Sequence, residues 1–133
     1  MATLYRQVEV STGEGKFGQK VSVGPHQLVA DEAEGDGGDD RGPSPHEFLM
    51  MGLGACTSMT VKVYAERKGI PLRSVDVKVR GRRDEAEGFV VELELSLSGD
   101  LDEAAREQLL RIAGKCPVHR TLTRGAKIAT RLV

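Results

Sequence analysis

Two cysteines, Cys56 and Cys116, are the residues of this sequence with the most distinctive chemistry. Cys116 stands directly before Pro117, and proline is favoured at the first position of a helix. A thiol at a helix N-cap faces free backbone N–H groups and the positive end of the helix dipole, and both stabilise a thiolate. Cys116 is therefore predicted to be either a reactive thiol or a simple capping residue.

The charge around Cys116 is one-sided. From residue 108 to the end the chain has no acid, His119 lies close by, and the bases are Arg111, Lys115, Arg120, Arg124, Lys127 and Arg131. This stretch is either a solvated basic face or a field that favours a thiolate. Cys56, by contrast, lies in an apolar segment, where a lone cysteine usually packs as a small inert hydrophobe.

Other site chemistries find no support in the spacing of residues. The cysteines and histidines form neither C-x-x-C nor H-x-x-x-H, so no metal site is expected. Ser58 lacks a G-x-S-x-G elbow, and the glycines at 13–15 and 35–38 do not follow the strand-to-helix layout of phosphate loops. No bound cofactor is expected. A net charge of −1 and 4% aromatic residues argue against binding to nucleic acid or to an anionic membrane.

Size and composition predict an ordinary globular protein. The 133 residues are 39% apolar and 29% charged, which favours one domain over residues 1–133. The first residues lack a signal-peptide pattern and there are only two cysteines, which favours a cytoplasmic protein over a secreted disulfide scaffold. The longest apolar run, 48–56, is shorter than a bilayer requires, so no membrane span is expected.

The elements needed to position the cysteines follow from periodicity. Residues 4–10 and 20–30 are predicted to be antiparallel strands, the second interrupted by a Gly24-Pro25 turn. An acidic, glycine-rich loop over 31–42 follows and is expected to be mobile, because its composition cannot bury apolar surface. Whether it acts as a lid stays open.

A long central helix is predicted next. Ser44 as N-cap, Pro45 and Glu47 form a capping-box pattern, and the helix is expected to end near Lys68, before Gly69. Its first half is apolar on every side, so it is expected to be buried all round. A domain of this size has difficulty surrounding such a helix, and we expect a second subunit to cover part of it, with close approach permitted by the small residues Gly52, Gly54 and Ala55.

The rest of the chain completes an α+β fold. Alternating apolar residues predict a β-hairpin over 75–80 and 89–98 with a polar turn at 82–88. Asp100 and Glu103 suggest a second capping box for a helix that ends at Gly114. A short helical turn is expected from Cys116, and residues 127–133 are predicted to form a closing C-terminal strand.

Two blocks of residues resemble one known family. The segment 42–49 (GPSPHEFL) followed by 53–57 (LGACT), and Cys116-Pro117-Val118 sixty residues after the first cysteine, are similar to motifs of the OsmC/Ohr superfamily of thiol-dependent hydroperoxide reductases. The resemblance spans the chain. It implies an OsmC-like fold and an intertwined homodimer, with two long central helices packed between sheets and paired active sites at the subunit interface.

The resemblance also implies roles for the cysteines. Cys56 would attack an organic hydroperoxide and become a sulfenic acid, and Cys116 would resolve it as a disulfide. An external thiol, such as a lipoyl-type dithiol, would then reduce the disulfide. Phe48, Met51 and Met59 are candidates for an apolar substrate pocket, although ordinary core or dimer packing is the simpler explanation for any one of them.

One part of the family pattern differs in this sequence. Peroxidases of the family use an N-terminal arginine held by an acid, whereas this chain has no arginine between Arg6 and Arg41. Lys16 or Arg41 is the candidate replacement, although a lysine does not reproduce the arginine fork. Glu47 is the candidate acid, and it is also explained as a capping residue. The alternative function is a redox-sensing or small-molecule-binding protein with little or no peroxidase turnover.

Overall fold

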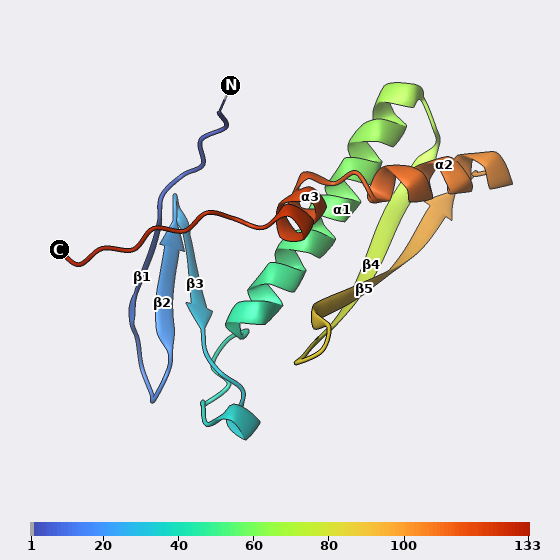
Figure 1. Ribbon diagram of the computed structural model, residues 1–133. Helices are drawn as coiled ribbons and strands as arrows, with labels where there is room; N and C mark the ends of the chain where they lie inside the picture. The colour runs from blue at the N-terminus through green and yellow to red at the C-terminus, as the bar shows by residue number, and fades with distance from the viewer. Residues whose placement is uncertain (1) are drawn as a thin grey trace. The chain divides into compact units, whose positions relative to one another are not determined.

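The computed structural model describes residues 2–133 and contains two compact units, one up to Leu49 and one from Met50 to Val133. Each unit is described by itself below. Helix α1 (Pro45–Lys68) begins in the first unit and continues into the second (Figure 1). Both units contain antiparallel sheet and the second also contains helices, which confirms the predicted α+β class.

The N-terminal unit contains a three-stranded antiparallel meander of β1 (Val8–Thr12), β2 (Gln19–Val23) and β3 (His26–Ala30). The turn at Gly24-Pro25 is confirmed, and Gly24 has a φ of 55°. The first strand starts later than predicted. Val8 pairs with Val23, the last residue of β2 before that turn, so the residues before Val8 have no partner on β2.

The acidic loop is organised around one buried carboxylate. Asp31 is 2% exposed and accepts hydrogen bonds from the backbone N–H groups of Glu32 (2.7 Å) and Arg41 (3.1 Å). The N–H of Arg41 is the largest cause that lowers the pKa of Asp31. A short 3₁₀ turn, η1 (Glu34–Asp36), lies between them. The predicted loop is present, and backbone hydrogen bonds that its composition did not reveal hold it in a defined conformation.

Both ends of α1 agree with the sequence. Glu47 Oε1 accepts from the N–H of Ser44 at 2.8 Å, and Ser44 Oγ accepts from the N–H of Glu47 at 3.4 Å. The helix ends at Lys68, and Gly69 follows with a left-handed φ of 66°. The predicted capping box and the predicted end of the helix before Gly69 are therefore confirmed.

The C-terminal unit places a β-hairpin beside helices. Strands β4 (Leu72–Asp84) and β5 (Gly88–Gly99) pair antiparallel, and α2 (Glu103–Ala113) and α3 (Pro117–Arg124) follow. Leu109 and Ala113 of α2 pack with Val61 and Ala65 of α1 to form the buried core cluster. Partly buried apolar residues of both strands, including Val75, Leu95 and Leu97, surround this cluster. The predicted inward face of the hairpin is confirmed.

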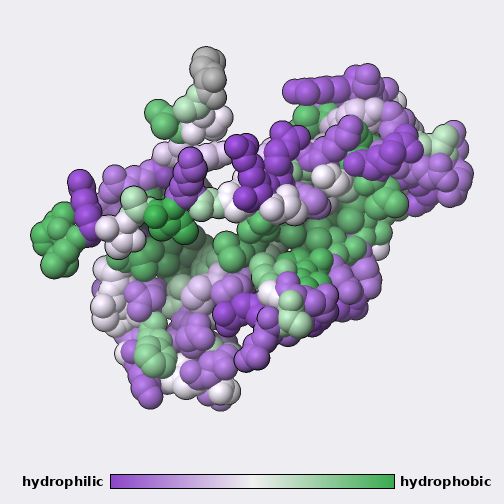
Figure 2. All heavy atoms as spheres, in the orientation of Figure 1, coloured by the Kyte–Doolittle hydropathy of each residue, from purple (hydrophilic) through white to green (hydrophobic). Residues whose placement is uncertain are grey.

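Only one side of α1 is buried. Its buried residues, Leu53, Thr57, Val61 and Ala65, are spaced four apart and form a single ridge. Met51, Met59 and Val63 are 45%, 65% and 46% exposed. Figure 2 shows hydrophobic surface over α1 and the hairpin. Within this single chain the hairpin and the two short helices cover one face only, and burial of the other side by a second subunit stays a prediction.

Helix α1 is the only helix of residues 2–133 that could span a membrane by length and composition, with a mean hydropathy of 1.2. The length of the apolar run 48–56 alone predicted no membrane span. Uncharged residues extend this run to Val61, so the apolar part of α1 is longer than that prediction assumed. Core helices of globular proteins meet the same criterion. We interpret α1 as a core helix, because Val61 and Ala65 pack against α2.

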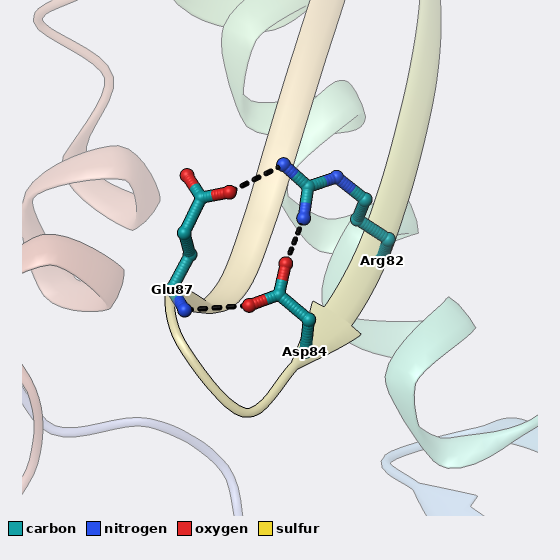
Figure 3. Close-up of polar contacts among 3 residues, drawn as sticks. All are labelled: Arg82, Asp84 and Glu87. Atoms are coloured by element: carbon teal, nitrogen blue, oxygen red, sulfur yellow. Dashed lines mark hydrogen bonds and ion pairs between the residues drawn. The ribbon is translucent and has the colours of Figure 1, made fainter.

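The hairpin extends further than the sequence suggested. Arg82, Arg83 and Asp84 pair with Val90, Phe89 and Gly88, so only residues 85–87 form the turn. At the tip, Arg82 forms ion pairs with Asp84 and Glu87, and Asp84 also accepts from the Glu87 N–H (Figure 3). These polar contacts let charged residues continue the strands where the sequence pattern indicated a turn.

Two further expectations are wrong. The N-cap of α2 is Asp102, not Asp100, and its carboxylate accepts from the N–H of Ala105 at 2.8 Å. An acid in the extended conformation directly before the first helical residue satisfies this donor, which Asp100 is too early to reach. Residues 127–133 form no strand, and Ile128 and Leu132 are 86% and 98% exposed. The alternating pattern is real, but within residues 2–133 the segment has no strand as a partner.

The core cluster leads to a stability prediction. Leu109 is fully buried and the adjacent Leu110 is 62% exposed, so the same substitution can be compared at a buried and an exposed position of one helix. We expect Leu109→Ala to lower the free energy of unfolding by about 2–5 kcal/mol, because it leaves a cavity between α1 and α2. Leu110→Ala should cost less than about 1 kcal/mol. Urea unfolding measures both, and equal losses would contradict this description of the core.

Candidate functional site

The structure brings the two cysteines together in the C-terminal unit. Cys56 lies near the middle of α1, and Cys116 is the N-cap of α3. The thiols are close enough for Cys56 to affect the pKa of Cys116 directly. Both are free in this structure. Two thiols from elements sixty residues apart therefore lie close together in one unit, where a two-electron oxidant can convert them to a disulfide.

Cys116 occupies the predicted N-cap position, and the pKa of its thiol is raised rather than lowered. Its sulfur accepts a hydrogen bond from the N–H of His119 at 3.4 Å, as an N-cap should. The residue is 1% exposed, and burial is the largest cause that raises the pKa of its thiol. Cys56 raises that pKa further, and the His119 N–H and the Thr57 hydroxyl oppose the rise. Of the two interpretations of Cys116, the capping role is confirmed, and the thiol pKa is raised rather than lowered because loss of water outweighs the helix N-terminus.

Cys56 is the more accessible of the two thiols. It is partly buried, whereas Cys116 is fully buried. Its sulfur lies 4.0 Å from the hydroxyl oxygen of Thr60, one helical turn later. A small oxidant from solvent would therefore meet Cys56 before Cys116.

Thr57 is a site residue that sequence reasoning missed. It is 1% exposed, and its hydroxyl has no hydrogen-bond partner within residues 2–133. Leaving a buried hydroxyl unpaired costs about 1–3 kcal/mol. The hydroxyl nevertheless lies near enough to Cys116 to lower the pKa of that thiol. A polar residue at the i+4 spacing of the buried ridge was the available signal in the sequence.

A groove of about 430 Å³ is formed by α1, β5 and the first turns of α3, close to the N-cap Cys116, although neither cysteine lines it. His119, whose N–H is capped by the sulfur of Cys116, lines it, as does Leu53, one helical turn before Thr57. The other lining residues are Phe89, Val90, Val91, Leu93, Leu122 and Thr123. The lining is mainly apolar, as an organic ligand would require.

The predicted pocket residues lie elsewhere. Met51 and Met59 are on α1 but do not line this groove, and both are substantially exposed. Phe48 belongs to the N-terminal unit. The groove was not foreseen because the hairpin strand β5 and helix α3 supply most of its lining, and the sequence does not show that they converge.

The remaining candidate residues have local partners within the N-terminal unit. Arg41 Nη1 forms an ion pair with Glu14 Oε2 at 2.9 Å. The Lys16 N–H donates to Asp39 Oδ2 at 3.1 Å, and its ammonium lies 5.4 Å from the centre of the Phe17 ring. Glu47 is engaged in the capping box, and hydrogen bonds from Ser44 lower its pKa. Across residues 2–133, no three His, Cys, Asp or Glu side chains are grouped so as to hold a metal ion.

The raised pKa of Cys116 can be measured by alkylation. We expect iodoacetamide to label Cys116 slowly at pH 7, with a pH midpoint above the ordinary cysteine value of about 8.5, because burial disfavours the thiolate. Mass spectrometry of the Cys116 peptide across a pH series measures this. The same protein unfolded in urea is the control and should label with the ordinary midpoint. A midpoint below that of the unfolded chain would contradict the assignment.

Several solved structures share this fold. An OsmC-like protein from Mycoplasma pneumoniae matches with a TM-score of 0.77 and 21% identity, covering 92% of this chain and 89% of its own. An organic hydroperoxide resistance protein OsmC from Legionella pneumophila matches with a TM-score of 0.69 and 19% identity, covering 92% and 91%. The organic hydroperoxide resistance protein OhrB of Bacillus subtilis matches with a TM-score of 0.64 and 21% identity, covering 93% of both chains.

These identities are below 25%, so the structural matches establish the fold alone. A comparison with curated proteins found no match. A family model described as OsmC-like protein matches residues 37–131, which include both cysteines, the capping box of α1 and the groove. Since this match covers well over half of the sequence, the protein belongs to the OsmC family.

Proposed function

We propose that this protein is a thiol-dependent peroxidase that reduces organic hydroperoxides. The observation that carries the proposal is the meeting of two free thiols, one accessible and one buried, beside an apolar groove. Membership of the OsmC family supports it, as do structural neighbours named organic hydroperoxide resistance proteins.

The proposed reaction uses both thiols in sequence. The Cys56 thiolate attacks one peroxide oxygen, the O–O bond breaks, and the alkoxide leaves as an alcohol after taking a proton. Cys56 is then a sulfenic acid. The Cys116 thiol attacks its sulfur, the S–O bond breaks, and the hydroxyl leaves with the proton of the thiol as water. An external dithiol of the lipoyl type, or another thiol, reduces the disulfide through a mixed disulfide.

The burial of the two cysteines fits this division of roles. A peroxidatic thiol must meet its substrate, and Cys56 is the more exposed of the two. A resolving thiol needs only to reach Cys56. Because burial raises its pKa, Cys116 remains a protonated thiol until the sulfenic acid forms beside it. It is thereby protected from direct oxidation, since thiolates are the reactive species.

We propose that a cation assists the attack by Cys56, and Lys16 and Arg41 of the N-terminal unit are the candidates. Arg41 is paired with Glu14 at 2.9 Å, so it would act at Cys56 only after exchanging that partner. The ammonium of Lys16 has no carboxylate partner among residues 2–133, which favours Lys16 for this role. Glu47 already caps α1, and we propose that its main role is structural.

We also propose that the working unit is a homodimer. The second side of α1 exposes Met51, Met59 and Val63, and a Cβ added at Gly52 would meet nothing within 4 Å. Gly54, by contrast, is explained within the chain, because a Cβ there would lie 3.0 Å from Val79. A second copy seated on this face would bury the exposed side chains and could complete a substrate pocket that includes Phe48, Met51 and Met59.

The activity prediction depends on the two thiols. With tert-butyl hydroperoxide and dihydrolipoamide, the wild type should turn over steadily, and Cys56→Ser should fall to the uncatalysed rate because the attacking sulfur is lost. Cys116→Ser should oxidise Cys56 once and then stall at the sulfenic acid. The apolar groove should make tert-butyl hydroperoxide at least about tenfold faster than hydrogen peroxide, since each buried CH₂ contributes about 0.8 kcal/mol.

Ser58→Ala is the control for this assay, because it changes a small polar side chain on the same helix. Its activity should match that of the wild type. A wild type that forms the disulfide once but shows no steady consumption of peroxide would overturn the peroxidase proposal. That result would support the alternative, a redox-sensing or small-molecule-binding protein.

The dimer is tested by light scattering after gel filtration. We expect a mass of twice the 14.4 kDa chain. Val63→Glu should shift the protein toward the monomer, because it places a charge on the exposed apolar side of α1. Lys62→Glu, the same new side chain at the neighbouring charged position, should remain dimeric. A wild type that stays monomeric at all concentrations tested would contradict the proposal.

A further inference from the structure

The Thr57 hydroxyl has no structural explanation in its helix. The buried ridge of α1 consists of Leu53, Thr57, Val61 and Ala65, and Thr57 is its only polar member. A threonine in a helix often bonds the carbonyl one turn earlier, but Thr57 makes no hydrogen bond within residues 2–133. Valine would fill the same volume without burying an unpaired polar group. Packing alone therefore does not account for a threonine here.

This hydroxyl lies near the thiols of Cys56 and Cys116. Thr57 directly follows Cys56 and lies on the buried ridge between Leu53, which lines the groove with His119 of α3, and Val61, which packs on α2. It therefore faces the junction of α2 and α3 that carries Cys116, and its hydroxyl lowers the pKa of that thiol. Both Thr57 and Cys116 are 1% exposed, so water does not reach the sulfur. Besides Cys56 and Thr57, the polar contact of this sulfur is the His119 N–H at 3.4 Å. Very few hydrogen-bond donors are therefore available to stabilise a thiolate formed at Cys116.

We propose that Thr57 stabilises the Cys116 thiolate in the step that forms the disulfide. This inference rests on the proposed function, in which Cys116 resolves a Cys56 sulfenic acid. As Cys116 begins to attack, its proton moves toward the departing hydroxyl and negative charge develops on its sulfur. The Thr57 O–H turns toward that sulfur and donates a hydrogen bond. The S–S bond forms, the S–O bond breaks and water leaves, while Thr57 keeps its own proton.

In the resting protein the Thr57 hydroxyl is buried and makes no well-formed hydrogen bond within residues 2–133. A donor that was committed to another partner would have to give it up as charge develops on the sulfur. Thr57 has no other partner to lose, so its interaction with the sulfur strengthens as the thiolate forms. An interaction that is stronger in the transition state than in the ground state accelerates the reaction step.

The first experiment measures the acidity of Cys116 without peroxide. In a Cys56→Ala background, thiolate absorbance at 240 nm reports Cys116 alone, since the chain has no other cysteine. We expect Thr57→Val to raise the pKa of Cys116 and Thr57→Ser to restore it. Thr60→Val is the matched control, because its hydroxyl contacts Cys56 rather than Cys116. It should leave the pKa of Cys116 unchanged.

The second experiment separates the two chemical steps. Stopped-flow oxidation by tert-butyl hydroperoxide, with dimedone trapping of the sulfenic acid, follows Cys56 oxidation and disulfide formation independently. Thr57→Val should slow disulfide formation about tenfold, the loss expected for one hydrogen bond to a charged sulfur, and leave Cys56 oxidation unchanged. The pH at which resolution is half-maximal should rise, and Thr57→Ser should reverse both effects.

A purely structural role gives a different result. In that case Thr57→Val would lower the Tm and slow both steps together, whereas we expect its Tm to be no lower than that of the wild type. An unchanged pKa of Cys116 in the stable Thr57→Val variant would overturn the proposal and leave the peroxidase function intact. A wild type without peroxide consumption would instead refute the function, while the pKa comparison would still decide the role of Thr57.

Discussion

The packing of α1 along a single ridge determines the rest of this structure. Because a helix repeats nearly every four residues, one line of side chains from Leu53 to Ala65 faces the hairpin and α2. The contacts of Val61 and Ala65 with Leu109 fix how far the helix is rotated about its axis. That rotation aims Thr57 at Cys116 and leaves Cys56 at the edge of the buried face. The core and the site are thus set by the same contacts.

The same ridge leaves the other side of a long apolar helix uncovered. The C-terminal unit offers one hairpin and two short helices, and these cannot surround a helix of 24 residues. Glycine has a cost inside a helix, so two glycines within one turn call for a reason. The close approach of Gly54 to Val79 explains that glycine, whereas no contact within residues 2–133 explains Gly52. The proposed second subunit on the open side would account for both the exposed methionines and Gly52.

Local signals in the sequence were sufficient for many of the element boundaries. Ser44 and Glu47 were recognisable as a capping box because their hydrogen bonds span only three residues. The N-cap of α2 at Asp102 was missed, because another acid two positions earlier fits the same pattern and only backbone conformation separates them. The roles of Thr57 and the raised pKa of Cys116 depend on which segments surround them. Burial by segments that are distant in the sequence produces no periodic pattern, so these two features could be identified only from the structure.

Cys116 illustrates why position in an element does not by itself determine reactivity. A helix N-terminus stabilises an anion by at most about 2 kcal/mol, even in favourable geometry. Removing a thiolate from water opposes this with an effect that reaches several pKa units for fully buried groups. At Cys116 burial prevails, and the pKa rises although the His119 N–H points at the sulfur. A thiol with a raised pKa is less suited to attack peroxide first, because the thiolate is the reactive form. The same property fits the resolving role proposed for Cys116, in which the thiol gives up its proton only as it attacks the Cys56 sulfenic acid.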